Sequence, residues 1–295
     1  MNLGELQTFL EVIDTGSLAA AAPRLHVTPS TVTARINALE EQLGCRLLHR
    51  NKSGAELTSA GFRLQRYAEL MTQLWRQARH DVALPPGVAG VCNVGLEFDL
   101  WRDVGSRFLD HVRRRSPDIA TALWPGEQRQ LQRWLEIGLI DIAFGYVAQA
   151  GEGFTSRLLL EDELVLVSPR AGASAELDDG YVFVDHGDEF RRQHAESFPG
   201  APPSLVTIAA SDWALDYLQR TTSKGYLPTR LVVPLLASGR LHRVAGAPRF
   251  VRRVYLIESV RAVENWAWYE SAVAATSDPV SAPRDSAAAG PTPRL

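Results

Sequence analysis

The chain has 295 residues, of which 45% are hydrophobic and 22% are charged, and its formal net charge is -3. This composition supplies enough apolar surface for a folded core, which excludes a wholly disordered chain and a collagen-like one. The small net charge excludes a uniformly basic nucleic-acid binder but leaves room for a local basic patch. The length predicts roughly two domains of about 150 residues each.

Cysteine usage and hydropathy indicate the compartment. The sequence has only two cysteines, Cys45 and Cys92, which excludes a small disulfide scaffold and a cysteine-built zinc site and fits a reducing compartment. No segment approaches the ~18–20 apolar residues of a membrane helix. The residues after Met1 lack the charged start and apolar run of a signal peptide. We therefore expect a cytoplasmic protein with no membrane partner.

The first segment has the spacing of short helices. Apolar residues from Leu3 to Ile13 fall on one helical face, and Gly16-Ser17 ends that helix and caps a second one. Thr28-Pro29 begins a third helix, because a capping hydroxyl precedes proline at the first helical position. Gly44 ends the third helix. Pro23 lies inside the second helix, which should kink or end there.

A basic hairpin follows. The extended runs Arg46–Arg50 and Ala55–Thr58 are joined by turn-forming residues 51–54. Residues 46–66 hold, against Glu56 alone, the basic residues Arg46, Arg50, Lys52, Arg63 and Arg66. Two helices joined by a tight turn and followed by a hairpin are typical of a winged helix-turn-helix, whose second helix enters the major groove. A plain three-helix bundle with a solvated hairpin has the same spacing, so the pattern leaves both interpretations open.

A long helix is predicted from Ser59 to about Val82, before the helix-breaking residues 84–87. Apolar residues recur along it at spacings of four and three: Leu64, Ala68, Met71, Trp75, Ala78 and Val82. Such a seam is typical of a coiled coil, so we expect this helix to pair two chains.

Beyond the break, strand and helix patterns alternate. Strands are predicted at Val91–Leu96, Ile119–Trp124, Asp141–Tyr146, Glu163–Ser168, Tyr181–Asp185, Leu205–Ala209 and Val254–Glu258, and helices at Asp99–Arg115, Glu127–Gly138 and Asp212–Thr222. This alternation predicts an α/β fold with mostly parallel sheets and a ligand site beyond the carboxyl ends of the strands. The tail from about Thr276 is rich in Ser, Ala and Pro, and we expect it to be disordered.

The sequence resembles the LysR-type transcriptional regulators. The match is dense over residues 1–66, and it includes Leu6–Phe9, Gly16–Leu18, Ala21-Ala22, Leu25–Thr28, Val32–Ile36, Leu39-Glu40, Leu43-Gly44, Leu47-Leu48, Arg50 and Leu57–Gly61. Looser similarity extends to about residue 275 through Leu100-Trp101, Pro117-Asp118, Ile140–Ala143, Gly225–Pro228 and Gly246–Pro248. Together with Val184–Phe190, these later segments most resemble an HdfR-like branch of the family.

The resemblance implies a domain organisation and partners. It implies an N-terminal all-α winged helix-turn-helix domain over residues 1–58 and a linker and dimerisation helix over 59–84. A two-subdomain α/β effector domain similar to periplasmic binding proteins is expected over 88–275, before a disordered tail over 276–295. The expected partners are double-stranded DNA and further copies of the chain in a homodimer or homotetramer, with RNA polymerase and a small-molecule effector as additional ones. No cofactor, metal site or catalytic residue is expected.

The expected DNA-contacting residues lie on the third helix and the wing: Ser17, Thr28, Pro29, Ser30, Thr31, Thr33, Ala34, Arg35, Arg50 and Lys52. Arg35 is the strongest candidate for a guanine contact, while Arg50 and Lys52 should hold the phosphate backbone. The wing departs from the family pattern, because Ser53 and Glu56 stand where arginines are usual.

The expected effector-binding residues are Leu96, Glu97, Phe98, Asp99, His186, Ser211 and Asp212. In the family, the first strand of the effector domain often ends in Ser or Thr that binds a small carboxylate, whereas this chain has Glu97 and Asp99 there. Both acids suit a helix start, and we expect that role; if they instead face the cleft, they disfavour an anionic effector. Ser211 and Asp212 are likewise expected to cap the later helix.

Three alternatives to an effector-controlled regulator remain open. One is a solute-binding module whose helical domain only dimerises. Another is an enzyme that uses Glu97 and Asp99, although no G-x-S-x-G, Walker A or G-x-G-x-x-G motif occurs. The third is a DNA-binding regulator with a degenerate cleft that responds to no small molecule. The Thr28-Pro29 helix start and the wing favour a regulator over the first two.

Overall fold

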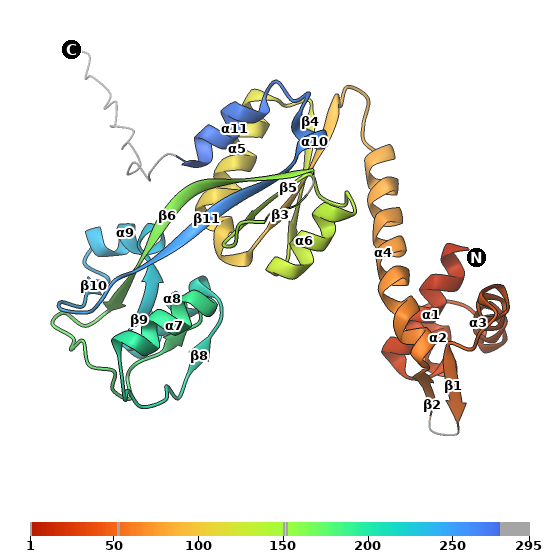
Figure 1. Cartoon of the computed structure of the whole chain (residues 1–295), viewed down its shortest axis with the longest axis horizontal. Helices are drawn as coiled ribbons and strands as arrows, with labels where there is room; N and C mark the ends of the chain where they lie inside the picture. Colours follow the sequence, from red (N-terminus) through yellow and green to blue (C-terminus); the bar gives the residue numbers. More distant parts are fainter. Residues whose placement is uncertain (1, 52–53, 150, 152, 278–295) are drawn as a thin grey trace, which may run out of the picture. The chain divides into compact units, whose positions relative to one another are not determined.

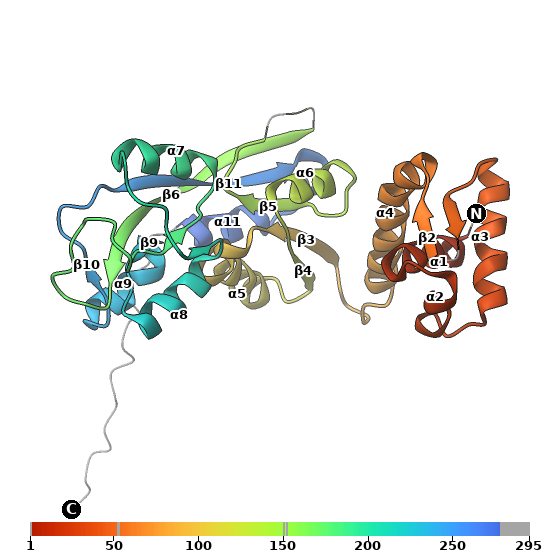
Figure 2. The ribbon, with the colours of Figure 1, turned by 90° about the horizontal axis from the view of Figure 1, so that it is seen from below.

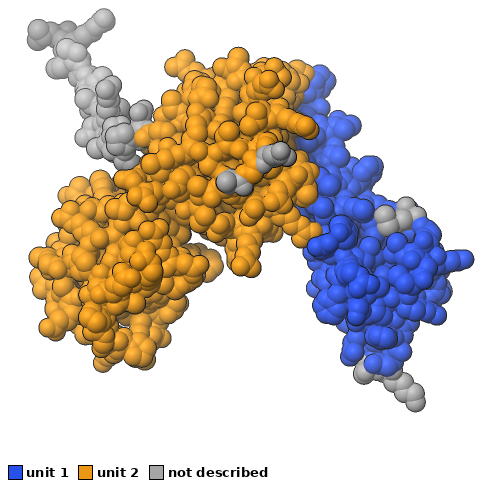
Figure 3. Space-filling model, viewed as in Figure 1, with its two compact units in different colours: residues 1–86 blue, residues 87–295 orange. Residues whose placement is uncertain are grey.

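A computed structural model describes residues 2–51, 54–149, 151 and 153–277. Contacts divide the chain into two compact units, residues 1–86 and residues 87–295 (Figure 3), which are described separately below. Among the described residues, no helix combines the length and apolar character that crossing a lipid bilayer requires.

The N-terminal unit combines helices with a two-stranded hairpin (Figure 1). Its elements are α1 (Leu3–Thr15), α2 (Leu18–Arg24), α3 (Pro29–Leu43), β1 (Leu48–Asn51), β2 (Gly54–Leu57) and α4 (Ser59–Val82). Phe9, Ile36 and Leu39 are fully buried at the centre of this unit. The helices therefore enclose one core, and the outer face of α3 stays in solvent.

Local sequence signals act as predicted around α3. The Thr28 hydroxyl accepts a hydrogen bond from the Thr31 backbone N–H, Pro29 occupies the first helical position, and Gly44 closes the helix at a φ of 66°. Helix α2 ends at Arg24, directly after Pro23, so the proline lies in the last turn. This confirms the expected break.

The hairpin has a shorter turn than predicted, because β1 extends to Asn51 and β2 begins at Gly54. Strands β1 and β2 are antiparallel and pair Leu48 with Leu57 and Asn51 with Gly54. Gly54 has a φ of 143°, and a Cβ there would lie 2.4 Å from the Gly16 carbonyl oxygen, so only glycine fits where the hairpin contacts the turn between α1 and α2.

The C-terminal unit is built on a mixed seven-stranded sheet in the order β10-β6-β11-β5-β3-β4, with β9 paired to β6. Its strands are β3 (Gly90–Leu96), β4 (Ile119–Pro125), β5 (Ile142–Gly145), β6 (Phe154–Ser168), β9 (Gly225–Pro228), β10 (His242–Arg243) and β11 (Phe250–Ser259). A separate parallel pair is formed by β7 (Phe183–Val184) and β8 (Thr207–Ile208). The helices are α5 (Ser106–Arg115), α6 (Gln128–Glu136), α7 (Asp188–Ser197), α8 (Ser211–Thr221), α9 (Thr229–Ala237), α10 (Val260–Val263) and α11 (Tyr269–Ser277).

The prediction of mostly parallel sheets is wrong. Strand β3 is parallel to β4 and β5, but β11 is antiparallel to both β5 and β6, and β6 is antiparallel to β9 and β10. The strands expected at Glu163–Ser168 and Val254–Glu258 are the ends of the longer strands β6 and β11. Acidic residues in β6 obscured its length in the sequence, but Asp162 and Glu161 lie opposite Arg252 and Arg253 in β11.

The two long strands connect two lobes (Figures 1 and 2). The first lobe contains β3, β4 and β5 and packs its core around Phe108, Phe144 and Leu256. The second lobe contains β7 to β10 and α7 to α9, with cores around Val167 and Leu218 and around Tyr226 and Phe250. Because β6 and β11 run through both lobes, polar residues along them lie at the boundary between the lobes.

Two further predictions need correction. The helix expected over Asp99–Arg115 begins as a 3-10 turn at Phe98–Leu100 and a π-helical turn at Trp101–Gly105, and only then becomes α5. Thr276 and Ser277, expected in the disordered tail, belong to α11 because Thr276 is buried. The rest of that tail, residues 278–295, lies outside the described residues.

Candidate nucleic-acid interface and interlobe cleft

Three hydroxyl groups gather at the N-terminus of α3. The Thr28 Oγ1 lies 2.8 Å from the Ser30 Oγ and 2.9 Å from the Thr31 Oγ1, and Thr28 and Ser30 are exposed. Each hydroxyl can donate and accept, so the cluster suits both base edges and phosphate oxygens. The helix dipole adds a partial positive charge at the same place.

The other residues expected to contact DNA are arranged differently. The Thr33 hydroxyl donates to the Pro29 carbonyl at 3.1 Å, and Ala34 is exposed. Arg35 is half-buried and donates from Nη1 to the Thr8 hydroxyl of α1 at 3.3 Å. Ser17 caps α2 by accepting from the Ala20 N–H at 3.4 Å. Arg35 and Ser17 thus have roles within the domain and are not bonded to the hydroxyl cluster.

Glu40 fixes the wing to α3, and sequence reasoning missed this role. Its Oε1 accepts from the Leu47 N–H at 2.8 Å and the Leu48 N–H at 3.2 Å. Its Oε2 lies 2.9 Å from Arg46 Nη1 and 3.2 Å from Arg50 Nη2. Burial opposes ionisation, but these four donors outweigh it and lower the pKa of Glu40. Because Glu40 takes the Leu47 and Leu48 N–H groups, β1 begins later than the sequence predicts.

Arg50 is already bonded within the domain. Besides Glu40, it donates from Nη2 to the Asn37 Oδ1 at 2.8 Å, so α3 and the wing share this side chain. Lys52 and Ser53 lie outside the described residues. Glu56 is exposed on β2, opposite His49. In the described part of the wing, Arg50 is therefore a positioned cation.

The predicted seam of α4 divides into two parts. Ala68 is fully buried and Leu64 partly buried against the core of this same unit, so these two residues face their own chain and not a partner. Met71, Trp75, Ala78 and Val82 are exposed. The second half of the helix thus leaves an apolar row uncovered.

In the C-terminal unit, Glu97 and Asp99 lie at a helix start, as expected, but their side chains bond to distant residues. Neither caps the turn that follows β3. The Glu97 Oε1 accepts from the Tyr146 N–H at 3.0 Å, and burial raises the pKa of Glu97 although that N–H and Arg252 limit the rise. Leu96 is buried and Phe98 is exposed beside them.

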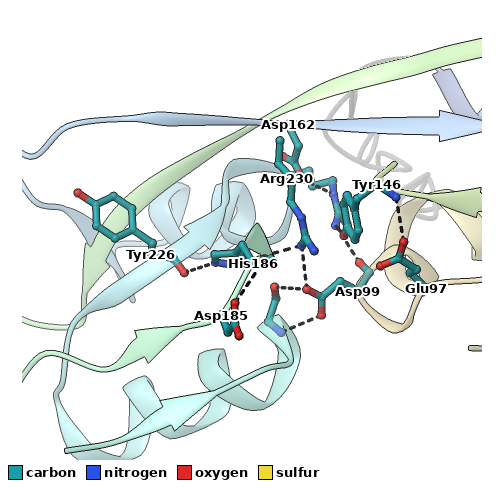
Figure 4. A network of polar contacts seen from close by, with 11 residues as sticks. Glu97, Asp99, Tyr146, Asp162, Asp185, His186, Tyr226 and Arg230 are labelled. Carbon is teal, nitrogen blue, oxygen red and sulfur yellow. Dashed lines mark hydrogen bonds and ion pairs between the residues drawn. The ribbon is translucent and has the colours of Figure 1, made fainter. Parts of the chain in front are cut away.

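Asp99 connects the two lobes. Its Oδ1 accepts from the Ser211 backbone N–H at 2.8 Å and its Oδ2 accepts from the Ser211 hydroxyl at 2.7 Å, both at the N-terminus of α8 (Figure 4). Ser211 therefore binds Asp99 and is not a cap of its own helix. Asp212 is not a cap either, because it pairs with Arg102 at 2.7 Å. The expected capping roles of both residues are wrong, since long-range partners take their side chains.

Arg252 and His186 complete this contact. Arg252 Nη1 lies 3.3 Å from the Asp99 Oδ2, and its guanidinium lies 3.2 Å above the ring centroid of Tyr146. His186 is buried and donates from Nε2 to the Tyr226 carbonyl at 2.9 Å, while its Nδ1 lies 3.5 Å from Arg252. Burial, together with the neighbouring Arg252, lowers the pKa of His186 to about 4. His186 is therefore neutral at physiological pH.

Arg230 is a second buried cation at the lobe boundary, and its role was also missed. It donates from Nε to the Asp162 Oδ2 at 2.6 Å, from Nη1 to the Asp103 Oδ2 at 3.2 Å and from Nη2 to the Asp99 carbonyl at 2.8 Å. Burial raises the pKa of Asp162, and Arg230 limits that rise. These partners are separated by 68 to 131 positions in the sequence, so no local motif could have indicated them.

Two cavities lie in this unit around the Asp99 contact. A polar one of about 570 Å³ is lined by residues that include Glu97, Tyr146, Asp185, His186 and Arg252. An apolar one of about 530 Å³ is lined by residues that include Phe98, Asp99, Trp101 and Trp213. The predicted effector residues divide between the two cavities. Glu97 and His186 line the polar one, and Leu96, Phe98, Asp99 and Asp212 line the apolar one. Ser211 lines neither cavity but binds Asp99. In the part of the chain that the structure describes, no three His, Cys, Asp or Glu side chains cluster as a metal site requires.

Two family descriptions match the sequence. Residues 3–62 match the bacterial regulatory helix-turn-helix proteins of the lysR family, and residues 85–262 match the LysR substrate binding domain. The HTH-type transcriptional regulator HdfR of Salmonella schwarzengrund is 28% identical over 256 residues, which are 85% of this chain and 90% of that protein. HdfR of an Escherichia coli strain is 27% identical with the same coverage. These matches confirm the resemblance found in the sequence.

Solved structures share the fold. CbnR, a LysR family transcriptional regulator, superimposes with a TM-score of 0.71 at 20% identity, covering 94% of this chain and 100% of that chain. Full-length CbnR complexed with its target DNA gives 0.69 at 21% identity with the same coverage. ArgP from Mycobacterium tuberculosis gives 0.54 at 22% identity, covering 92% of this chain and 96% of that chain.

Proposed function

This chain belongs to the LysR family of bacterial transcriptional regulators, and on that premise we propose which of its surfaces bind DNA, a second chain and an effector. It is a DNA-binding transcriptional regulator that carries the family's helix-turn-helix and substrate-binding domains. We divide it into a DNA-binding domain (1–58), a linker and dimerisation helix (59–84) and an effector domain (88–275), and it acts in the cytoplasm, where RNA polymerase is a further partner.

The N-terminus of α3 enters the major groove and reads bases. The observation that carries this proposal is the exposed hydroxyl cluster of Thr28, Ser30 and Thr31 at the positive end of a helix. Thr33 and Ala34 extend this surface along α3. Arg35 contacts guanine, because its bond to Thr8 uses one of five guanidinium donors and leaves the others for a base.

The wing and the flanking residues bind the phosphate backbone. Asn37 and Glu40 hold Arg50 in position before DNA arrives, which reduces the side-chain entropy lost on binding. Lys52 acts at the tip of the wing, and Ser17, Thr28 and Pro29 contact the backbone at the two helix starts. A positioned cation of this kind contributes to binding on every DNA sequence.

Two chains pair through α4. Met71, Trp75, Ala78 and Val82 form an exposed apolar row on a helix of 24 residues, and an uncovered row of this kind is typical of an interface. Pairing gives the dimer two copies of α3 for two half-sites of an interrupted palindrome. Contacts between effector domains extend the dimer to a tetramer.

Binding of the full-length protein to the DNA upstream of its own gene tests the proposal, by gel shift and footprinting over a salt titration. We expect two protected half-sites on one face of the DNA. Ser30→Ala should weaken specific binding roughly tenfold and leave non-specific binding unchanged. Arg50→Ala should weaken binding to all sequences and reduce the salt slope by about one.

The matched control is Glu41→Ala, which removes an exposed side chain near the far end of α3 and should leave both affinities unchanged. Equal losses in Ser30→Ala and Glu41→Ala would contradict the assignment of the hydroxyl cluster. An unchanged salt slope in Arg50→Ala would contradict the role of the wing. A folded, dimeric protein that binds no operator and no non-specific DNA would contradict the DNA-binding surface as a whole.

A further inference from the structure

The apolar cavity of about 530 Å³ has the size and lining of a small-molecule site. It lies between Phe98 and Trp101 of the first lobe and Trp213 at the start of α8 in the second. These three aromatic side chains are 65%, 46% and 74% exposed. Large aromatic side chains gathered at an open cavity indicate a binding surface more often than scattered exposed residues do.

The charged side chains around this cavity disfavour an anionic ligand. Among the described residues that line it, the only charged side chains are Asp99 and Asp212. Asp212 is paired with Arg102, and Asp99 is paired with Arg252. A ligand carboxylate would therefore meet two acids and no lining side chain with a positive charge.

Asp99 also occupies the place that a carboxylate would prefer. The N-terminus of a helix binds anions through its free N–H groups, and at α8 the Ser211 N–H and the Ser211 hydroxyl already bind the Asp99 carboxylate at 2.8 and 2.7 Å. The Asp99 side chain is only 9% exposed, and Arg252 of β11 lies 3.3 Å from it. The chain thus supplies its own anion at this helix terminus.

We propose that the apolar cavity binds a flat, uncharged aromatic molecule and that Asp99 is the residue that excludes aromatic carboxylates. This deepens the proposed function, since it rests on residues 88–275 being the effector domain of the regulator. The rings of Phe98, Trp101 and Trp213 supply stacking and apolar contact. A carboxylate could bind only by displacing Asp99 from Ser211, and a tethered group competes strongly because its effective concentration is high.

A pair of probes with the same ring tests this proposal: 2-naphthalenemethanol, which is uncharged, and 2-naphthoate, which carries a carboxylate. We would titrate each into the full-length protein by calorimetry. The alcohol should bind at least tenfold more tightly than the carboxylate. Asp99→Ala should reverse this preference, because it leaves the α8 N–H group, the Ser211 hydroxyl and Arg252 free to bind the carboxylate.

Further variants control for folding. Asp99→Asn keeps an oxygen for Ser211 but removes the negative charge, so it should reduce the preference even if Asp99→Ala folds poorly. Trp213→Ala should weaken binding of the alcohol about tenfold. Leu205→Ala removes an apolar side chain that is 84% exposed and does not line the cavity, and it should have no effect.

The proposal is overturned if the wild-type protein binds neither probe or prefers 2-naphthoate, if both Asp99 variants retain the wild-type preference, or if Leu205→Ala weakens binding as much as Trp213→Ala. Gel shifts without probe separate this result from the proposed function. Loss of DNA binding with the probe preference intact would refute the DNA-binding assignment and leave the cavity site standing. Normal DNA binding with no probe bound would refute the cavity site alone.

Discussion

The N-terminus of α3 and the boundary between the two lobes use polar groups in opposite ways. At α3, Thr28, Ser30 and Thr31 bond only to neighbours within three residues, and the cluster stays open to solvent. At the lobe boundary, Asp99 binds Ser211 across 112 positions and Arg252 across 153, and its side chain is almost fully covered. The hydroxyls of α3 thus stay accessible to a ligand although they bond to one another, whereas the polar groups of the boundary hold distant parts of the chain together.

The two regions therefore differ in what a substitution removes. When an exposed polar group is removed from α3, water takes its place, so the free energy of unfolding changes little. The main effect should be on the affinity for DNA. A buried charge that loses its partner cannot be replaced in this way, because water does not reach the remaining group. Substitutions at the lobe boundary should therefore cost more stability than substitutions at the N-terminus of α3.

Replacing Arg230 should give the largest loss of stability. Arg230→Met keeps an apolar stem of similar reach but leaves Asp162, which is 3% exposed, without its cation. Breaking a buried pair in this way costs about 3–5 kcal/mol. Urea unfolding followed by tryptophan fluorescence measures it, because several tryptophans lie in the C-terminal unit.

The control for this prediction is Arg253→Met, on strand β11. Arg253 pairs with Glu161 at 3.0 Å, and both side chains are about half exposed, so solvent screens the pair and the free energy of unfolding should change little. Similar losses in the two variants would show that the boundary network is no more important than a surface ion pair.

Removing Glu40 should cost an intermediate amount of stability. Glu40 is an exception to the comparison above, because it is a buried carboxylate with several partners inside the DNA-binding domain. Glu40→Ala leaves the Leu47 and Leu48 N–H groups without an acceptor, at a cost of about 1–3 kcal/mol. It also frees Arg46 and Arg50, so DNA affinity should fall on all sequences. Thermal unfolding and gel shifts measure the two effects.

Glu41→Ala, one position along, is again the matched control, since Glu41 is exposed. The effect of Glu40 should also depend on pH. Its folded-state pKa is lower than its ordinary value, so its contribution is complete above that ordinary value, near about 4.3, and disappears as the pH falls through the folded pKa. The protein can be compared with Glu40→Ala down to the lowest pH at which both stay folded. If the stability difference did not decrease over this range, the ionised form of Glu40 would not be the stabilising one.

The effect that should be smallest at neutral pH is the pH dependence from His186. Its folded-state pKa is about 4, against about 6.5 for an ordinary histidine, so the unfolded chain takes up a proton first as the pH falls. Stability should therefore be flat above about pH 7 and should decrease toward pH 4, by at most about 1.4 kcal/mol per pH unit from this residue. Burial also lowers the pKa of His194, which acts in the same direction.

Urea unfolding between pH 4.5 and 7.5 measures this slope. His186→Gln keeps a donor for the Tyr226 carbonyl and should reduce the slope. The same slope in the His186→Gln variant and the wild-type protein would assign the pH dependence to other groups.

The sequence alone determined the features that depend on neighbouring residues. Apolar spacing, the Thr28-Pro29 start and the Gly44 stop predicted α1 to α3, because caps and helical faces are properties of a few consecutive residues. The dense family resemblance over residues 1–66 identified the regulator, and the length of α4 followed from its seam and from the prolines after it.

Only the tertiary structure decided the features that join distant residues. It made the sheet mixed, because β6 and β11 run antiparallel through both lobes. It also made Asp99, which the sequence predicts only as an acid at a helix start, the partner of Ser211. It also turned Leu64 and Ala68 toward their own core. Local propensity carries no information about a partner more than 60 positions away, and burial then decides which polar groups must find one.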